Sequence, residues 1–432
     1  MKLVKMSLAT AVLLGASAFA IDNVKVSGDA KLYYSTDSAD RPGLSDGLFG
    51  QDASVGDTAL RIAVTGDLTS NVSFGATGYA VSSLGLENNL VSNVWAGSRN
   101  GVQDSAWMGE LWMAATAGKT TVKAGRMELD TPLVFSEKWS VVPNTFNAAV
   151  LINQDIPDTT IVGAWIGQGN GLNAVGAFDP DFSNDNLEGW DYMGKDFGTF
   201  AAGGAYALGA INNSFKPLVA QAWYYNVSDV ADAYWLQADW DCQLVEGVKV
   251  GVQYSEMDTK GILSDQKDSS AYAVKLAYSG LKDLTLSAAY SSADEDNGAL
   301  NIANVATANS VNGYSIYGAN SAKFAAQTKL YTEAWWNYGY VGVAGADTIT
   351  LAAAYDAGFA QFFAQYTDVS IQPAPVAPAT AGDTTDLTEV TLTATKTFGP
   401  LSTTLAYIFA DDTSVNNSKS YDTVMAMFQF NF

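Results

Sequence analysis

Histidine is absent from this 432-residue sequence, and cysteine occurs once, at Cys242. Without histidine the chain cannot build a Ser-His-Asp triad or the usual zinc sites, and a single cysteine allows no intramolecular disulfide. Basic residues are scarce too, with 22 Lys and Arg against 45 Asp and Glu and a formal net charge of −23. Because phosphate binding needs a basic patch, this balance argues against nucleic acid as a partner. The absences together argue against an enzyme.

Long hydrophobic runs are also missing. The apolar run near the N-terminus, Leu8–Gly15, is too short for a membrane-spanning helix, which needs about 20 apolar residues. Lys2 and Lys5 precede this run and a small-x-small site at residues 18–20 follows it, which is the layout of a secretory signal peptide. We therefore expect residues 1–20 to be removed on export, and the mature chain, residues 21–432, to begin at Ile21.

Glycine (39), tyrosine (21) and tryptophan (11) are plentiful, proline is limited to 10 residues, and the mean hydropathy is only +0.04. This hydropathy is too polar for a helical membrane protein. A β-barrel wall alternates lipid-facing and lumen-facing residues, so its mean hydropathy lies near neutral. An exported chain of this composition, without a later apolar run, favours an outer-membrane barrel over soluble domains.

Apolar residues recur at every second position in runs of about ten residues that turn residues separate, which is typical of barrel strands. The run 248–255 is an example, with valine and tyrosine at even positions and polar or small residues at odd positions. The last such run ends in a terminal Phe432. This ending resembles the assembly signal of bacterial outer-membrane proteins, and it predicts recognition by the barrel assembly machinery.

These runs predict an all-β fold, a transmembrane antiparallel β-barrel of about 18 strands. The strands are expected near 24–35, 57–67, 72–81, 106–115, 120–126, 148–153, 159–166, 198–207, 216–225, 233–241, 247–255, 269–278, 284–292, 348–355, 359–367, 387–397, 401–410 and 421–432. Short turns and long polar loops alternate between them, and both termini must lie on the periplasmic side, so the strand number must be even. Leu330–Tyr340 is assigned to a long loop, because one more strand would break this parity.

Charged residues on the predicted strands fall opposite the apolar set, on the face expected to line a polar lumen. This set is Lys25, Asp29, Lys31, Arg61, Glu110, Lys123, Asp239, Asp241, Lys249, Lys275 and Glu389. We expect each to be a solvated lumen charge rather than a specific binding group. Because these charges nearly cancel, the acidic excess lies in loops, where it raises the local cation concentration. Such loops also offer oxygen ligands for Ca²⁺, although no run matches an EF-hand loop.

The segments Ala124–Leu133 and Val142–Ala149 resemble the third-loop region of the major outer membrane porins of epsilonproteobacteria, which are relatives of OprD-type porins. Leu330–Tyr340 and Leu405–Asp412 also resemble family segments, and the resemblance runs the length of the mature chain. It implies a homotrimer of barrels of about 18 strands, each with its third loop folded inward as a constriction. OprD-type relatives line the pore with arginines for carboxylates. Here arginine occurs at four positions only (41, 61, 99 and 126), which leaves that preference open.

The loop that the resemblance folds inward, Met127–Asn147, is therefore the expected constriction. Its candidate pore residues are Glu128, Asp130, Glu137 and Lys138, with Phe135 and Trp139 as packing anchors. Arg126 stands where the strand is expected to turn inward. Two interpretations of Arg126 stay open, a direct role in the pore and an ion pair with Asp130 or Glu128 that holds the loop.

The sequence thus predicts a porin for passive diffusion of ions and small hydrophilic solutes, modestly preferring cations, surrounded by outer-membrane lipid and lipopolysaccharide and needing no cofactor. The alternative is a barrel that acts chiefly as an adhesin or structural surface protein through loops 167–197 and 293–347. An inward third loop separates the two, because an adhesin needs no constriction.

Overall fold

The fold is known from a computed structural model that describes residues 21–38, 47–86, 105–138, 141–170, 197–199, 203–294, 300–305, 326–372, 385–412 and 419–432. The expected signal peptide (1–20), Trp139 and most of the acidic loop residues (40, 46, 179–188, 295 and 296) lie outside these described residues. Within them, no helix has the length and apolar character needed to cross a membrane.

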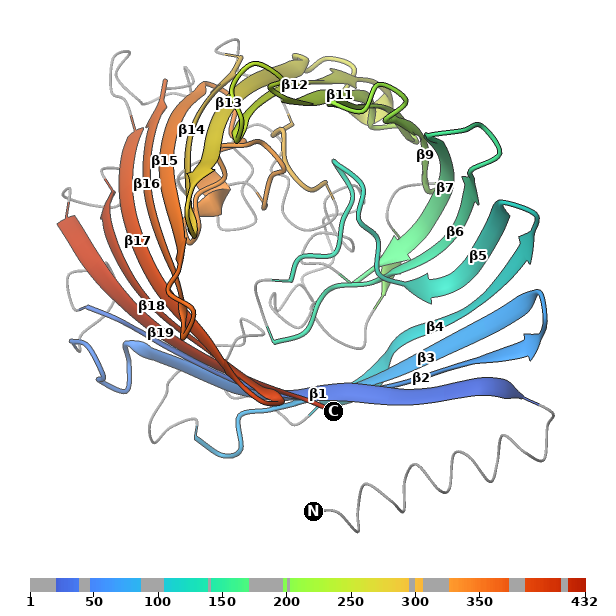
Figure 1. The fold of residues 1–432 in the computed structure, drawn as a ribbon, viewed down its shortest axis with the longest axis horizontal. Helices are drawn as coiled ribbons and strands as arrows, with labels where there is room; N and C mark the ends of the chain where they lie inside the picture. The colour runs from blue at the N-terminus through green and yellow to red at the C-terminus, as the bar shows by residue number, and fades with distance from the viewer. Residues whose placement is uncertain are drawn as a thin grey trace.

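Antiparallel strands form one sheet that closes on itself, as the view down the ring shows (Figure 1). The strands are β1 (Asp22–Asp37), β2 (Ser54–Thr69), β3 (Val72–Ser82), β4 (Ser105–Ala117), β5 (Thr120–Met127), β6 (Phe146–Asn153), β7 (Thr159–Gly169), β8 (Gly198–Thr199), β9 (Ala205–Asn212), β10 (Leu218–Val227), β11 (Ala231–Asp241), β12 (Val248–Thr259), β13 (Ser269–Leu281), β14 (Leu284–Ala293), β15 (Ala346–Asp356), β16 (Gln361–Ile371), β17 (Thr385–Phe398), β18 (Leu401–Asp412) and β19 (Lys419–Asn431). Pairing of β1 with β19, from Asp29 with Asn431 to Asp37 with Thr423, closes the ring.

The described strands occupy eighteen positions in the wall, because β8 and β9 share one. Both pair with β7, β8 at Gln168–Gly169 and β9 at Thr159–Ile166. The prediction of an 18-strand barrel is therefore confirmed, but the predicted strand at 198–207 is displaced, since the wall strand runs to Asn212. Gly203 and Gly204 separate the two pieces with φ angles of 86° and 84°, a conformation that ends a regular strand.

The connections follow the predicted alternation with one exception. The turns that join β2 to β3, β4 to β5, β13 to β14, β15 to β16 and β17 to β18 are short, as predicted. On the opposite rim, where long loops are expected, β10 and β11 are joined by residues 228–230 alone. Asp229 makes this tight connection with a φ of 59°, which Asp tolerates better than most residues. Leu330–Tyr340 forms no strand, as predicted, and ends in a single 3-10 turn, η2 (Tyr338–Tyr340).

The two faces of the wall differ in chemistry. Large aliphatic side chains stand exposed on the outer face, with Leu236, Leu276 and Leu405 each about half exposed (50, 54 and 52%). On the inner face of the same sheet, Ser255, Thr348 and Thr391 are fully buried beneath other residues. An apolar outer surface, with polar side chains on the inner face of the same strands, is the arrangement of a barrel in lipid.

Thiol labelling tests this register. In a Cys242→Ser background, cysteine at 239 or 249 should react with a small hydrophilic reagent, and cysteine at 238 or 250 with a lipid-phase reagent. Lys249 has a side chain that is 61% exposed, so position 249 should react faster than 239, which the segment described below covers. Because a one-residue slip moves every side chain to the other face, the reverse pattern at all four positions would overturn the register.

Candidate pore constriction

The described part of the connection between β5 and β6, residues 128–138 and 141–145, lies inside the ring of strands, and we call it the first inward segment (Figure 1). Leu133 is 1% exposed and packs in one cluster with Trp223 and Tyr225 of β10. The Leu133 backbone N–H donates to the Tyr225 hydroxyl at 3.4 Å. The predicted inward-folded loop is therefore present.

A second inward segment, residues 300–305 and 326–345, precedes β15 and also lies within the ring (Figure 1). Three inner-face carboxylates hold it. Tyr331 donates its hydroxyl to Asp239 Oδ1 at 2.6 Å, and Tyr340 donates to Asp412 Oδ2 at 2.6 Å. Between them, Glu389 accepts hydrogen bonds from the backbone N–H groups of Trp336 and Asn337 at 3.0 and 2.7 Å.

The two inward segments bind each other. Asn304, which is fully buried, donates its side-chain amide to the Phe135 carbonyl at 2.8 Å and to Glu137 Oε1 at 3.0 Å. The Val305 N–H donates to the Leu133 carbonyl at 3.0 Å. Lys329 forms an ion pair with Asp130. Because these contacts hold the two inward segments to each other, both segments together narrow the interior of the barrel.

Charged side chains of both signs meet where the first inward segment faces β1, β2 and β5. Arg61 Nη2 lies 2.6 Å from Asp29 Oδ2, and its Nη1 lies 3.7 Å from Glu128 Oε1. Lys138 Nζ lies 2.7 Å from Glu128 Oε2. These pairs join the wall to the segment through Glu128.

Other predicted wall residues also lie on the inner face, and Glu110 and Lys123 lie near the charges around Glu128. Glu110 accepts a hydrogen bond from the Thr77 hydroxyl at 3.0 Å, and Lys123 lies over the Trp112 ring at 4.1 Å. Lys275 lies over the Tyr331 ring at 4.4 Å. Lys249 pairs with Asp241 at 3.0 Å beside the short β11–β12 turn, away from the inward segments.

The sequence interpretation placed Arg126 at the inward turn of the chain, but the structure places it on the outer face of the wall. It pairs in register with Leu111, which is 56% exposed on the outer face, whereas Lys123 three residues earlier points inward. The strand keeps its alternation to Met127, so the chain turns inward one residue later than expected. Arg126 donates to Asn147 Oδ1 at 3.0 Å and to the Met108 carbonyl at 2.7 Å, and no ion pair with Asp130 or Glu128 forms among the described residues.

Three carboxylates are more buried than predicted: Asp29 and Glu389, expected to be solvated lumen charges, and Glu137, expected to line the constriction. Glu137 is 5% exposed beneath Asn304, and Glu389 is 1% exposed beneath the second inward segment. Alternation correctly puts Glu389 on the inner face, but it does not reveal that a later segment covers it. Glu137 and Glu389 therefore anchor the inward segments and do not line the pore.

Sequence reasoning missed the second inward segment as a pore element. Its anchoring residues, Tyr331, Trp336, Asn337 and Tyr340, stood in a stretch assigned only to a long loop. The many tryptophan, tyrosine and valine residues in 330–343 are the signal that this stretch is buried inside the barrel, because such side chains are costly to expose to water.

The comparisons with known proteins agree with this geometry. A model of the family described as "outer membrane porin, OprD family" matches residues 87–358. The chain belongs to the OprD family. It is therefore an outer membrane porin, a non-enzymatic channel for small solutes, and the comparisons lend no support to the adhesin alternative. No match was found among curated proteins.

Solved structures show the same fold at low identity. OccK3 (OpdO) of Pseudomonas aeruginosa has a TM-score of 0.66 at 13% identity, covering 95% of this chain and 96% of that one. OccK8 (OprE) of the same organism has a TM-score of 0.67 at 16% identity, covering 95 and 98%. OpdK, solved with vanillate, has a TM-score of 0.68 at 14% identity, covering 95 and 98%.

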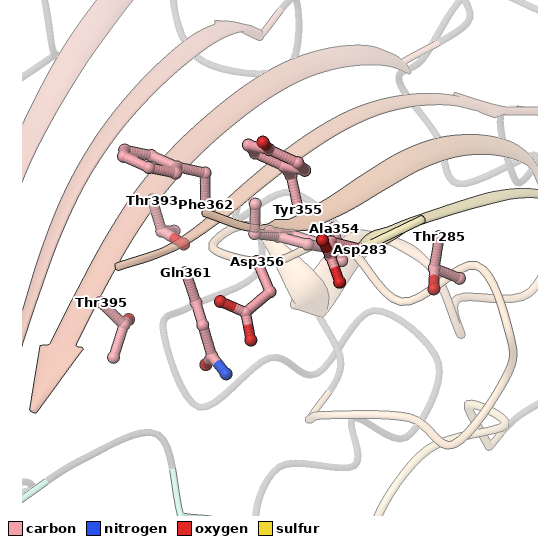
Figure 2. A pocket seen from close by; sticks show the side chains of 10 residues that line it. Asp283, Thr285, Ala354, Tyr355, Asp356, Gln361, Phe362, Thr393 and Thr395 are labelled. Atoms are coloured by element: carbon pink, nitrogen blue, oxygen red, sulfur yellow. The ribbon is translucent and has the colours of Figure 1, made fainter. Parts of the chain in front are cut away.

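An open cavity of about 450 Å³ lies in this OprD-family porin at the short-turn ends of β14–β17. Figure 2 shows Asp356 and Gln361 pointing to one side of the sheet, and Tyr355 and Phe362 to the other. The first pair shares the inner-face parity of Thr393. The cavity thus belongs to the short-turn mouth of the porin rather than to its constriction. Within the described chain, no group of three or more carboxylate or thiol side chains could hold a metal ion, and calcium binding stays a prediction.

Among the described residues, Glu333 is a titrating group that we expect to affect the inward segments near neutral pH. Burial raises the pKa of its carboxyl to about 8, and the neighbouring Glu137 carboxylate raises it further, while Lys329 opposes the rise. One buried oxygen, Oε1, has no hydrogen-bond partner in the described structure. Since an unfolded glutamate loses its proton near pH 4.5, docking of the porin's second segment weakens as pH rises from about 4.5 to about 8.

We expect Glu333→Gln to remove this pH dependence, because glutamine keeps the shape and never ionises. Single-channel recordings from pH 5 to 9 should show wild-type current noise growing towards pH 9 and a variant that stays quiet throughout. Equal noise in the two proteins at pH 9 would show that Glu333 does not ionise between the segments.

Proposed function

We propose that this OprD-family porin is a water-filled channel for passive diffusion of ions and small hydrophilic solutes, with a modest preference for cations. The supporting observation is the mixed charge beside the first inward segment, where Arg61 and Lys138 both meet Glu128. Opposite charges that nearly cancel at the narrow region give little selectivity there. The net charge of −23 then favours cations at the entrances.

A reversal-potential measurement across a KCl gradient tests the preference. Entrance carboxylates act through water, and the Debye length is about 10 Å at 0.1 M and about 3 Å at 1 M. We expect a small cation preference at low salt that fades at molar salt. Selectivity for chloride at low salt, or steep cation selectivity that persists at molar salt, would contradict the proposal.

The assembled form is also part of the proposal. We infer a homotrimer in contact with lipopolysaccharide, exported by a signal peptide of residues 1–20 and delivered through the barrel assembly machinery. We place the chain among the major porins of epsilonproteobacteria on the resemblance of its third-loop and C-terminal segments. Chemical cross-linking of the purified protein tests the trimer, and N-terminal sequencing tests whether the mature chain begins at Ile21.

A further inference from the structure

Glu128 stands at the centre of a basic wall. Besides Arg61 and Lys138, which contact its two carboxylate oxygens, Lys31 and Lys123 lie within electrostatic range of it. These four cations come from β1, β2, β5 and the first inward segment, so distant parts of the sequence converge on one carboxylate.

The position of Glu128 is fixed by its neighbours. Met127 and Leu129 on either side of it are 1 and 7% exposed. Leu129 is tied across the segment by the Ser136 N–H, which donates to its carbonyl at 2.8 Å, and by its own N–H, which donates to the Ser136 hydroxyl at 3.2 Å. The Glu128 side chain remains 23% exposed. A fixed backbone therefore presents a carboxylate that water and solutes can reach.

The donors around Glu128 form a carboxylate-binding set. Lys138 lies within hydrogen-bond distance of one Glu128 oxygen, and the Arg61 guanidinium forms an ion pair with the other. Charge-assisted hydrogen bonds are the strong ones, and a guanidinium suits recognition of a carboxylate. Asp29 holds one side of the Arg61 guanidinium and leaves the other directed at Glu128. A dissolved carboxylate of similar size would find the same donors.

We propose that Glu128 is a specificity-determining residue, a built-in carboxylate that occupies an anion site on the pore wall and excludes monocarboxylate solutes from it. The proposal rests on the channel function proposed above. With Glu128 in place, the described residues put four cations opposite three carboxylates, Asp29, Glu110 and Glu128. Without the charge of Glu128, the same donors are open to a monocarboxylate that enters from water.

Glu128→Gln tests the proposal with benzoate as the probe. In planar bilayers we expect the variant to shift its reversal potential in a KCl gradient towards chloride, and millimolar benzoate to reduce its current while leaving the wild type unchanged. Glu110→Gln is the matched control, because Glu110 is an inner-face carboxylate that accepts from Thr77 but forms no ion pair among the described residues. It should shift the reversal potential less and show no benzoate block.

A second variant separates the site from a general charge effect. Adding Lys138→Met to Glu128→Gln should abolish the benzoate block, because it removes the ammonium that contacts the carboxylate. Equal shifts in Glu128→Gln and Glu110→Gln, or no benzoate block in a variant that still conducts and resists heat like the wild type, would overturn the inference. A wild type that conducts no ions would instead overturn the proposed function itself.

Discussion

Replacing Glu389 by alanine is expected to release the second inward segment from the wall and to raise the single-channel conductance. The buried carboxylate accepts four hydrogen bonds, from the N–H groups of Trp336 and Asn337, the Asn337 amide and the Thr391 hydroxyl. Each buried donor left without a partner costs about 1–3 kcal/mol. Because the narrowest cross-section limits the current, we expect an increase on the order of twofold, with greater noise.

Two control variants sharpen this experiment. Glu389→Gln keeps one acceptor oxygen in the same place and should give an intermediate conductance. Glu246→Ala removes an exposed carboxylate in the β11–β12 turn and should leave the conductance unchanged. If Glu389→Ala assembles normally and conducts like the wild type, the second inward segment is not part of the constriction.

Deletion of Phe432 is expected to impair barrel assembly strongly. Phe432 and Gly28 exchange two backbone hydrogen bonds of 2.9 Å at the seam between β19 and β1. At about 1 kcal/mol each, the loss of both lowers the equilibrium constant for seam closure by roughly a factor of 30. Heat-resistant migration of the membrane fraction in gel electrophoresis measures the yield of closed barrels.

The control for this deletion is an aromatic residue at the end of a strand that does not form the seam. Phe398 is 55% exposed at the end of β17, and Phe398→Ala should assemble in normal amount. A normal yield from the chain that lacks Phe432 would show that neither the seam pairing nor the C-terminal assembly signal depends on this residue.

The wall of the barrel is predictable from the sequence because its rule is local. Side chains alternate faces with a period of two, so Val250 and Lys249 can be assigned without knowledge of distant residues. The prediction of one strand at 198–207 is wrong for a local reason too, since Gly203 and Gly204 interrupt the extended backbone that the residue pattern suggested.

The interior is less predictable, because it depends on contacts between residues far apart in the chain. Glu389 is covered by Asn337, 52 positions away, and Glu137 by Asn304, 167 positions away. Periodicity predicts the face of each carboxylate but not the segment that covers it. For Arg126 the local rule alone is sufficient, since alternation from Lys123 places it on the outer face. The interpretation was wrong because it assumed that the chain turns inward at this residue.

Single-channel recording of the purified wild-type protein in planar bilayers tests the central claim most directly. A passive, water-filled pore with a mixed-charge constriction should give stable, nearly ohmic steps whose conductance grows in proportion to KCl concentration. Absence of steps from protein that shows the heat-resistant folded form, or a conductance that saturates at low salt as at a tight ion-binding site, would contradict this account.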